Sequence, residues 1–389
     1  MRILMPVLVR MPSARAPALQ TANMAQALVE HGHEVIVASP APPLPSELPD
    51  GWSAASTAEA DARLLGFTPG FRVVHGARRV RRGQSLTQSA RIARLARRLR
   101  PDLVLTRDLR AAVLPALRGV PTVVELHTLT SVSGALDRAA LRRLRRTPGH
   151  RGLVAISDPL AEDLVAEGLA TAEEVLVAPD AVRVDAHAEA VDAGRPATDG
   201  ARPQVGYTGS LYPGKGAETV VALAERCPWA DFHLAGGPAE EAERLRRRAD
   251  GRANLVVHGL LAQPETLALQ RSCDVLVAPF AAVVRSNSGV DIARWTSPLK
   301  VFEYLASGRP SVIGDLPGLR GVVHDGQDAL VVPPGDVDAF AAALERLTAD
   351  PVLAARLGRA GRTAAVERWS WSARAERILE RFVPGEVVA

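Results

Sequence analysis

Short apolar runs alternate with amphipathic segments along almost the whole chain of 389 residues. The runs are rich in Val, Ile and Leu, and the segments between them repeat their apolar residues every three or four positions. This alternation predicts an α/β fold, with parallel strands that helices cover on both faces. The expected strands are 2–9, 34–38, 103–106, 122–126, 152–156 and 175–178, then 204–208, 231–235, 255–258, 275–279, 311–313 and 329–332.

Periodicity stops between Asp185 and Pro203, where Ala, Asp, Gly and Pro dominate. A stretch of this composition is typical of an interdomain linker. We therefore predict two doubly wound, Rossmann-like domains, 1–185 and 204–366, joined by a linker at 186–203. The C-terminal helix, 367–389, is expected as a separate element that can pack back on the N-terminal domain. In such sheets, ligands bind at the carboxyl ends of the strands, in the central cleft that the two domains face.

Composition excludes several classes of protein. The apolar start of the chain contains Arg2 and Pro6, which favours a strand over a signal peptide, and no apolar run approaches the length of a membrane span. Cys227 and Cys273 form no disulfide or metal-binding pattern, so a cytoplasmic location is expected. Aromatic residues make up only 4% of the chain, which argues against a nucleic-acid surface.

Arginines cluster in the first half of the chain, at Arg78, Arg79, Arg81 and Arg82, at 91–100 and at 138–146. A basic face of this kind could meet an anionic membrane or an acidic acceptor. Solvated helix faces in an arginine-rich chain are the alternative, and the one that we favour.

Lysine is almost absent. Of 47 strongly basic residues only Lys215 and Lys300 are lysines, and both stand in turns marked by glycine or proline that lead into a helix. A compact ammonium cannot always be replaced by a planar guanidinium. We therefore treat both positions as candidates for binding an anion.

The segment Trp295–Pro310 is the most informative motif. Ser297 is expected to cap a helix that has Pro298 at its first position and Gly308 after its last turn. The uncapped N–H groups and the dipole of such a helix start suit a phosphate. Lys300 and Glu303, three residues apart, share one face and suit the phosphate and the ribose of a nucleotide. A surface helix with one ion pair is the alternative.

A glycine-rich turn, Gly209–Gly216, follows the strand 204–208 and leads into another helix. Its sequence is close to that of a P-loop, but Gly216 stands where Ser or Thr would hold Mg²⁺, so a P-loop phosphotransferase is disfavoured. A second turn contains Gly236 and could be only a tight strand–helix connection. His127 ends the strand 122–126, where it is either a cleft residue or a satisfied structural histidine. No Ser-His-Asp, paired-carboxylate or metal-ligand pattern stands out, so no metal is expected.

Together these motifs resemble one family. Gly209-Ser-Leu-x-x-x-Lys215-Gly216, Ala-Gly236-Gly237, the segment from Ser297 to Pro310 and the Trp369-Ser-Trp-Ser-Ala tail are similar to family 4 retaining glycosyltransferases of the GT-B fold. Val124-Glu125-Leu-His127 and Ala155-Ile-Ser157 resemble the N-terminal half of the same family.

The resemblance implies a nucleotide-sugar donor in the C-terminal domain, an acceptor in the N-terminal domain, and neither metal nor cofactor. It assigns Lys215 to the diphosphate and Glu303 to the ribose, and it places His127 near the donor sugar, with Lys215 and His127 as the catalytic candidates. The remaining donor-binding candidates are Ser297, Pro298, Leu299, Lys300, Trp295, Gly209, Ser210 and Gly236, and the acceptor candidates are Arg10 and Arg15, beside the first loop.

Three positions depart from the family pattern. Trp295 replaces the first of two carboxylates that are commonly eight residues apart, Ser210 replaces an arginine, and the first loop lacks a double glycine. We predict transfer of a sugar from a nucleoside diphosphate, with a UDP-sugar favoured, to a small natural product, a lipid or a glycan. The alternatives are a UDP-sugar 2-epimerase on the same fold and a nucleotide-sugar-binding protein with little activity.

Overall fold

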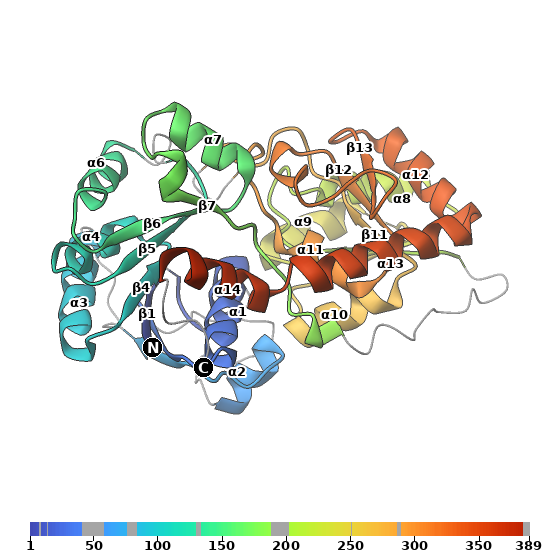
Figure 1. Ribbon diagram of the computed structural model, residues 1–389. Coiled ribbons are helices and arrows are strands. Elements are labelled where there is room, and N and C mark those ends of the chain that lie inside the picture. Colours follow the sequence, from blue (N-terminus) through green and yellow to red (C-terminus); the bar gives the residue numbers. More distant parts are fainter. Residues whose placement is uncertain are drawn as a thin grey trace. The chain divides into compact units, whose positions relative to one another are not determined.

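The computed structural model describes residues 1–7, 9–13, 15–40, 58–75, 84–129, 134–187, 202–249, 251–285 and 289–383 (Figure 1). These residues form two compact units. Unit 1 contains the described residues up to Pro179 and those from Trp371 onward, and unit 2 is Asp180–Ser370. The division therefore falls before the linker expected at 186–203, most of which lies outside the described residues. Arg78, Arg79, Arg81 and Arg82 also lie outside them.

Unit 1 is built on a seven-stranded parallel sheet with the strand order β3-β2-β1-β4-β5-β6-β7. Its central strands are buried along almost their whole length, because helices cover both faces of the sheet. The elements of unit 1 are β1 (Arg2–Pro6), α1 (Ala16–Glu30), β2 (Glu34–Ser39), α2 (Ala58–Leu65), β3 (Arg72–His75), α3 (Gln84–Leu99), β4 (Leu103–Thr106), α4 (Leu109–Leu117), β5 (Thr122–Leu126), α6 (Ala135–Leu144), β6 (His150–Ala155), α7 (Asp158–Ala166), β7 (Val175–Val177) and α14 (Trp371–Phe382).

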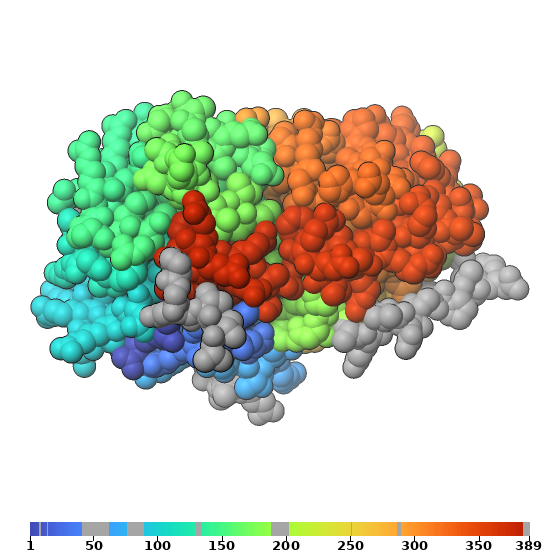
Figure 2. Space-filling view, in the orientation of Figure 1, coloured from blue at the N-terminus to red at the C-terminus, as the bar shows by residue number. Residues whose placement is uncertain are grey.

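The last helix, α14, belongs to unit 1 although it follows unit 2 in the sequence. It packs against α1 and β6, and Figure 2 shows its outer surface in dark red. The buried residues recur every three or four positions, as expected for an amphipathic helix: Trp371, Arg374, Ala375, Ile378, Leu379 and Phe382. The phenyl ring of Phe382 lies so close to Gly152 of β6 that a side chain at this glycine would overlap it.

Unit 2 is built on a six-stranded parallel sheet with the strand order β10-β9-β8-β11-β12-β13. One apolar cluster joins this sheet to α8, α9 and α12, and another lies under α11. The elements are β8 (Gln204–Thr208), α8 (Ala217–Arg226), β9 (Asp231–Ala235), α9 (Ala239–Arg248), β10 (Leu255–Gly259), α10 (Gln263–Ser272), β11 (Val275–Ala278), α11 (Leu299–Ser307), β12 (Ser311–Gly314), β13 (Leu330–Val332), α12 (Val337–Ala349) and α13 (Pro351–Arg368).

The alternation predicted from the sequence is confirmed, with local differences. Strand β1 ends at Pro6, three residues before the predicted end, and α1 begins at Ala16, where Pro17 fits its first turn. Strand β3 was not predicted, since it is a short edge strand with partly exposed residues at every position. None of the described helices is both long and apolar enough to cross a membrane.

Candidate active site

In the turn between β8 and α8, the backbone passes close to other backbone segments of unit 2. Gly216 adopts a left-handed conformation, with a φ of 109°, and a Cβ at this position would lie 2.6 Å from the carbonyl oxygen of Pro279. A Cβ on Gly236 would overlap the carbonyl oxygen of Gly209, so these two glycine turns also touch. No side chain caps α8, which leaves the N–H groups of its first turn available for an anion.

Lys300 lies beneath this turn. Its ammonium donates a hydrogen bond to the backbone oxygen of Lys215 at 3.1 Å and sits 3.8 Å from the ring centre of Tyr207 and 4.7 Å from that of Phe280. Burial, and then the charge of Lys215, hold the pKa of Lys300 well below its usual range, although Glu303 opposes the shift. A buried ammonium of this kind favours a negative ligand nearby.

Lys215 itself is half-buried. Burial lowers the pKa of its ammonium to about 8. None of the described carboxylates pairs with it. The structure therefore brings the only two lysines of the chain to one turn, where Lys300 is attracted by Glu303 and Lys215 has no carboxylate partner among the described residues.

The start of α11 differs from the prediction by one residue. Pro298 is the N-cap and Leu299 the first helical residue, and no side chain caps the helix. The expectation that Ser297 caps α11 is wrong, because its hydroxyl accepts a hydrogen bond from the N–H of Asp180 at 2.9 Å. The predicted end of the helix is confirmed, since Gly308 is left-handed with a φ of 71°.

Glu303 lies one turn into α11, on the face that it shares with Lys300. Its two carboxylate oxygens accept hydrogen bonds from the amides of Gln263, at 2.8 Å, and Gln270, at 2.9 Å. Burial raises the pKa of Glu303 against the effect of these amides and of Lys300. Each oxygen keeps lone-pair capacity for a hydroxyl, which is the contact expected for a ribose.

The remaining donor-binding candidates lie around this centre. Ser210 and Lys215 are linked by the phenol of Tyr207, which donates to the backbone oxygen of Ser210 at 2.6 Å and reaches that of Lys215 at 3.1 Å. Trp295 is partly exposed, and its backbone N–H donates to Ile292 at 3.0 Å. Among the described residues, no group of three or more His, Cys, Asp or Glu side chains could hold a metal ion.

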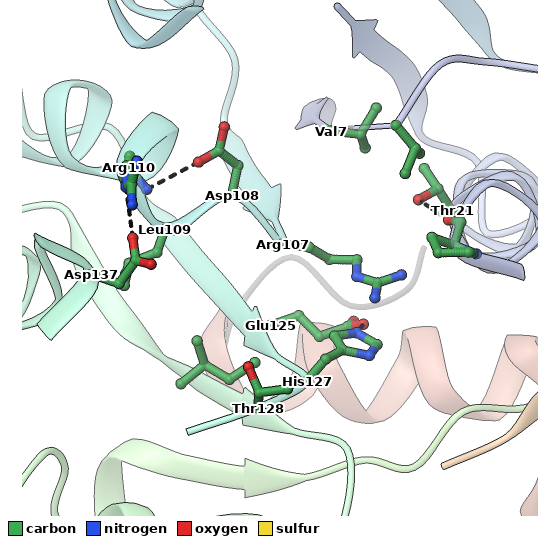
Figure 3. A pocket seen from close by; sticks show the side chains of 13 residues that line it. Val7, Thr21, Arg107, Asp108, Leu109, Arg110, Glu125, His127, Thr128 and Asp137 are labelled. Atoms are coloured by element: carbon green, nitrogen blue, oxygen red, sulfur yellow. Dashed lines mark hydrogen bonds and ion pairs between the residues drawn. The ribbon is translucent and has the colours of Figure 1, made fainter. Parts of the chain in front are cut away.

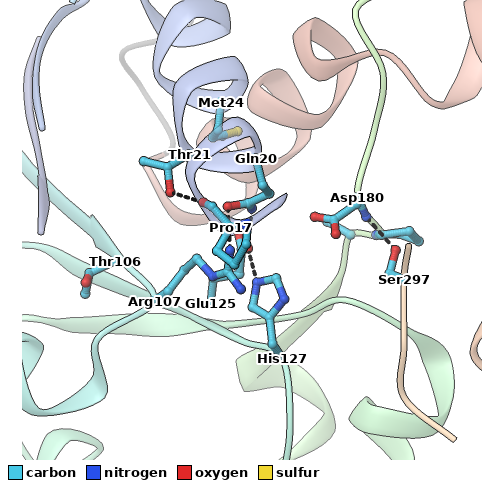
Figure 4. Close-up of polar contacts among 12 residues, drawn as sticks. Pro17, Gln20, Thr21, Met24, Thr106, Arg107, Glu125, His127, Asp180 and Ser297 are labelled. Atoms are coloured by element: carbon cyan, nitrogen blue, oxygen red, sulfur yellow. Dashed lines mark hydrogen bonds and ion pairs between the residues drawn. The ribbon is translucent and has the colours of Figure 1, made fainter. Parts of the chain in front are cut away.

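In unit 1, His127 follows β5 and belongs to a polar network (Figure 4). Its Nε2 lies 2.5 Å from the Oε1 atom of Glu125, which also accepts from the amide of Gln20 at 2.6 Å. The amide oxygen of Gln20 accepts from Arg107 at 2.9 Å. The second oxygen of Glu125 accepts from the fully buried Arg374 of α14 at 2.8 Å.

These partners determine the protonation of the histidine. Burial would raise the pKa of Glu125, but Arg374, His127 and Arg107 outweigh it and hold that pKa well below the usual range. Burial and Arg107 lower the pKa of His127 to about 4, although Glu125 opposes them. A neutral imidazole beside an ionised carboxylate must carry its proton on Nε2. Nδ1 is therefore a hydrogen-bond acceptor.

A cavity of about 460 Å³ opens beside His127 (Figure 3). Figure 3 shows Arg107 and His127 on one side of it and the ion pair of Arg110 with Asp137, 2.6 Å long, on another. The lining residues are Val7, Val9, Pro17, Thr21, Arg107, Asp108, Leu109, Arg110, Glu125, Leu126, His127, Thr128 and Asp137. Arg10 and Arg15 lie in the connection from β1 to α1 and are not among the lining residues.

Sequence reasoning did not identify Gln20, Arg107 or Arg374. Gln20 and Arg107 carry no motif, since their roles depend on contacts with residues far along the chain. Arg374 did leave a signal, because it stands on the apolar face of an amphipathic helix, where a charge needs a partner.

The chain has the two Rossmann-like parallel-sheet units that define the GT-B class of proteins. The second unit contains a glycine-rich turn and an uncapped helix start, both of which suit a phosphate. The family model described as "Glycosyltransferase Family 4" matches residues 18–185, and the model described as "Glycosyl transferases group 1" matches residues 202–350. The chain belongs to glycosyltransferase family 4.

Curated relatives match parts of the chain. The GDP-mannose-dependent alpha-(1-6)-phosphatidylinositol monomannoside mannosyltransferase of Mycolicibacterium smegmatis is 33% identical over 178 residues, 44% of this chain and 45% of the relative. The D-inositol 3-phosphate glycosyltransferase of Stackebrandtia nassauensis is 28% identical over 302 residues, 70% of this chain and 65% of the relative. The matches thus span less than two thirds of either relative.

Solved structures share the fold over nearly the whole chain. Anabaena HepE in complex with UDP has a TM-score of 0.68 at 17% identity, and the match covers 98% of this chain and 99% of that one. Sucrose-phosphate synthase from Thermosynechococcus elongatus has a TM-score of 0.70 at 18% identity, with 97% of each chain covered.

Proposed function

We propose that this protein transfers a sugar from a nucleoside diphosphate to an acceptor hydroxyl, with retention of the anomeric configuration. The observation that carries the proposal is the pair of lysines at the uncapped starts of α8 and α11, of which Lys215 has no carboxylate partner among the described residues. Negative charge develops on the departing diphosphate as the sugar–phosphate bond breaks. Preorganised cations and N–H groups stabilise that charge most where water is excluded.

Each residue of this centre has a distinct role in the proposal. Lys215 contacts the diphosphate directly, because its ammonium has no carboxylate partner among the described residues. Lys300 supports the turn from below and adds its field. Glu303 accepts the ribose hydroxyls, and Trp295 packs against the sugar. The reaction needs no metal or cofactor, since the two lysines supply the positive charge that a metal ion would otherwise provide.

The nucleotide is the first point to test. The sequence favours a UDP-sugar, and HepE was solved with UDP. The relative from Mycolicibacterium smegmatis is named as GDP-mannose-dependent. We therefore propose a nucleoside diphosphate hexose as the donor, with UDP-sugars and GDP-mannose as the two donors to compare.

The cavity of unit 1 supports a polyhydroxylated acceptor. Asp108 and Asp137 offer carboxylate oxygens to hydroxyl groups, and apolar residues such as Leu126 provide a surface for a ring. Both relatives carry an inositol-based compound in their names. An inositol-containing lipid or a small glycan is the acceptor class that we propose, with Nδ1 of His127 accepting a hydrogen bond from a sugar hydroxyl.

Calorimetry with UDP and GDP would identify the nucleotide. Incubation of the matching sugar nucleotides with a panel of inositols, glycans and lipids, with mass detection of products, would then test transfer. We expect one new glycoside, formed equally well in the presence of a chelator, and NMR should show that the anomeric configuration is retained.

Three results would contradict the proposal. A new nucleotide sugar formed without acceptor would indicate an epimerase. Nucleotide binding without turnover on any acceptor would indicate a binding protein. Activity lost with EDTA and restored only by Mg²⁺ or Mn²⁺ would favour the P-loop alternative.

A further inference from the structure

Arg374 lies where the chain crosses between the units. The chain leaves unit 1 after Pro179 and returns at Trp371, three residues before Arg374. The guanidinium donates to the backbone oxygen of Pro179 at 2.8 Å and to that of Ala178 at 3.1 Å. It thereby ties the returning helix to the last residues of the departing segment.

The same guanidinium reaches the candidate active site. Its Nη2 donates to Oε2 of Glu125 at 2.8 Å, and the other oxygen of Glu125 accepts from Nε2 of His127 at 2.5 Å. Only one residue therefore separates Arg374 from the imidazole that lines the cavity. The carboxylate cannot turn without breaking a bond to either side.

Stability alone is a weak reason for this arrangement. Removing two charges from water is costly, and a well-packed apolar pair of similar volume often stabilises a fold as well or better. Arg374 has no exposed surface, and its side chain is held by Glu125, by two carbonyl groups and by the sulfur of Met24 at 3.5 Å. Contacts on every side fix the guanidinium in one orientation, which is what the positioning of a reactive group requires.

We infer that Arg374 is a positioning residue of the sugar-transfer site: it holds Glu125 so that His127 carries its proton on Nε2 and presents Nδ1 to the substrate. The inference rests on the role proposed above for His127. Because the guanidinium also holds Ala178 and Pro179, it links the crossing segment to that imidazole.

The charged groups that act on His127 come from three elements. Glu125 belongs to β5, Arg107 follows β4, and Arg374 belongs to α14. Two of them are cations that disfavour the imidazolium, so removal of Arg374 raises the pKa of His127 above about 4.

The test compares Arg374→Lys, Arg374→Met and the double variant Arg374→Met/Glu125→Gln with wild type. We expect kcat to fall by about 10–100-fold in the single variants, the range seen when supporting hydrogen bonds of a site are lost. The fall in kcat should be smaller for Arg374→Lys than for Arg374→Met. Nucleotide affinity should not change, and the acid limb of the kcat profile should move to higher pH. In ¹⁵N NMR, His127 should be protonated on Nε2 in wild type and show mixed tautomers in the variants.

The double variant removes both buried charges and keeps the test open if Arg374→Met does not fold. Arg381→Met is the control on the same helix, since Arg381 is exposed and donates to the backbone oxygen of Glu173 at 2.5 Å. A folded variant with the wild-type tautomer and pH profile would overturn the inference. Because the NMR readout needs no substrate, a tautomer change in a protein without transfer activity would reject the proposed function and leave the positioning role intact.

Discussion

In unit 1 the carboxylate beside His127 is paired with a buried guanidinium, whereas in unit 2 the ammonium of Lys215 has no carboxylate partner among the described residues and shares its turn with that of Lys300. Glu125 is bonded by Arg374, Gln20 and His127, and the imidazole is neutral. Lys300 instead bonds a backbone oxygen, and Lys215 lies half-buried above it.

The difference indicates what each unit needs from a ligand. The polar groups around His127 are already hydrogen-bonded to one another, so this network gains little from a charged ligand. Two like charges beside uncapped helix starts are stabilised when a dianionic diphosphate arrives. The network of unit 1 is therefore preorganised without a ligand, whereas the lysines of unit 2 should gain their negative partner only when a ligand binds.

The largest expected effect comes from Lys215→Arg, which keeps the charge but widens the group. An ammonium approaches one phosphate oxygen as a point charge, whereas a guanidinium would displace the diphosphate. We expect turnover to fall at least about 10²-fold, the scale of losing one preorganised contact, with most of the loss in kcat. Lys300→Arg should cost less turnover, because N–H groups at the start of α11 share its role.

Arg226→Lys is the matched control for these swaps, because Arg226 forms an exposed 3.0 Å ion pair with Asp338 on α12. Its steady-state kinetics should equal those of wild type. Wild-type turnover in Lys215→Arg would remove unit 2's lysines from the mechanism and with them the contrast between the units.

Glu303→Gln should weaken nucleotide binding by about 1–3 kcal/mol, since a charge-assisted bond to ribose is lost. Gln263 and Gln270 would then face an amide rather than a carboxylate. Titration calorimetry with the nucleotide measures the change, and Glu243→Gln on the exposed face of α9 is the control. Equal affinity in a folded Glu303→Gln variant would show that the ribose binds elsewhere.

The pH dependence should separate the two units. The pKa of Lys215 is near 8 without ligand, and a diphosphate raises it by favouring the ammonium. As Lys215 loses its proton, nucleotide affinity should fall by up to about tenfold per pH unit above pH 8. In the free protein the sign is opposite: because the folded pKa lies below the unfolded value of 10.5, stability should rise as pH increases from about 8 to 10.5.

Proton uptake on binding tests this directly. Calorimetry near pH 8.5 in buffers of different ionisation enthalpy should show proton uptake in wild type and clearly less in Lys215→Arg. His127 should not titrate in this range, since its pKa is about 4. Uptake that is undiminished in Lys215→Arg would assign the proton to another group.

The smallest effect is expected at Trp295. Trp295→Glu should change which sugar nucleotides are turned over while the affinity for the free nucleotide stays nearly the same, because the indole is expected to contact the sugar alone. A competition assay with several donors measures the profile. An unaltered profile would mean that this loop does not face the sugar.

The fold could be predicted because its signals are local. Runs such as 122–126 and 204–208 are apolar along their whole length, and the glycine turns and the end of α11 at Gly308 are written in adjacent residues. Lys215, Lys300 and Glu303 stood out for the same reason. The prediction that Ser297 caps α11 was wrong, because its hydroxyl accepts a hydrogen bond from the backbone N–H of Asp180, which is 117 residues away. Arg374 and Glu125 are 249 residues apart, and no local pattern encodes such a pair.

The return of α14 to unit 1 also determines the order in which the chain can mature. A protein emerges from the ribosome from its N-terminus, and domains tend to fold as they become complete. Unit 2 is a continuous stretch from Asp180 to Ser370 among the described residues, so it can close before synthesis ends. Unit 1 begins first but must wait for Arg374 and Phe382, and until then Glu125 lacks its cation and Gly152 its covering ring. The unit that is started first is therefore finished last.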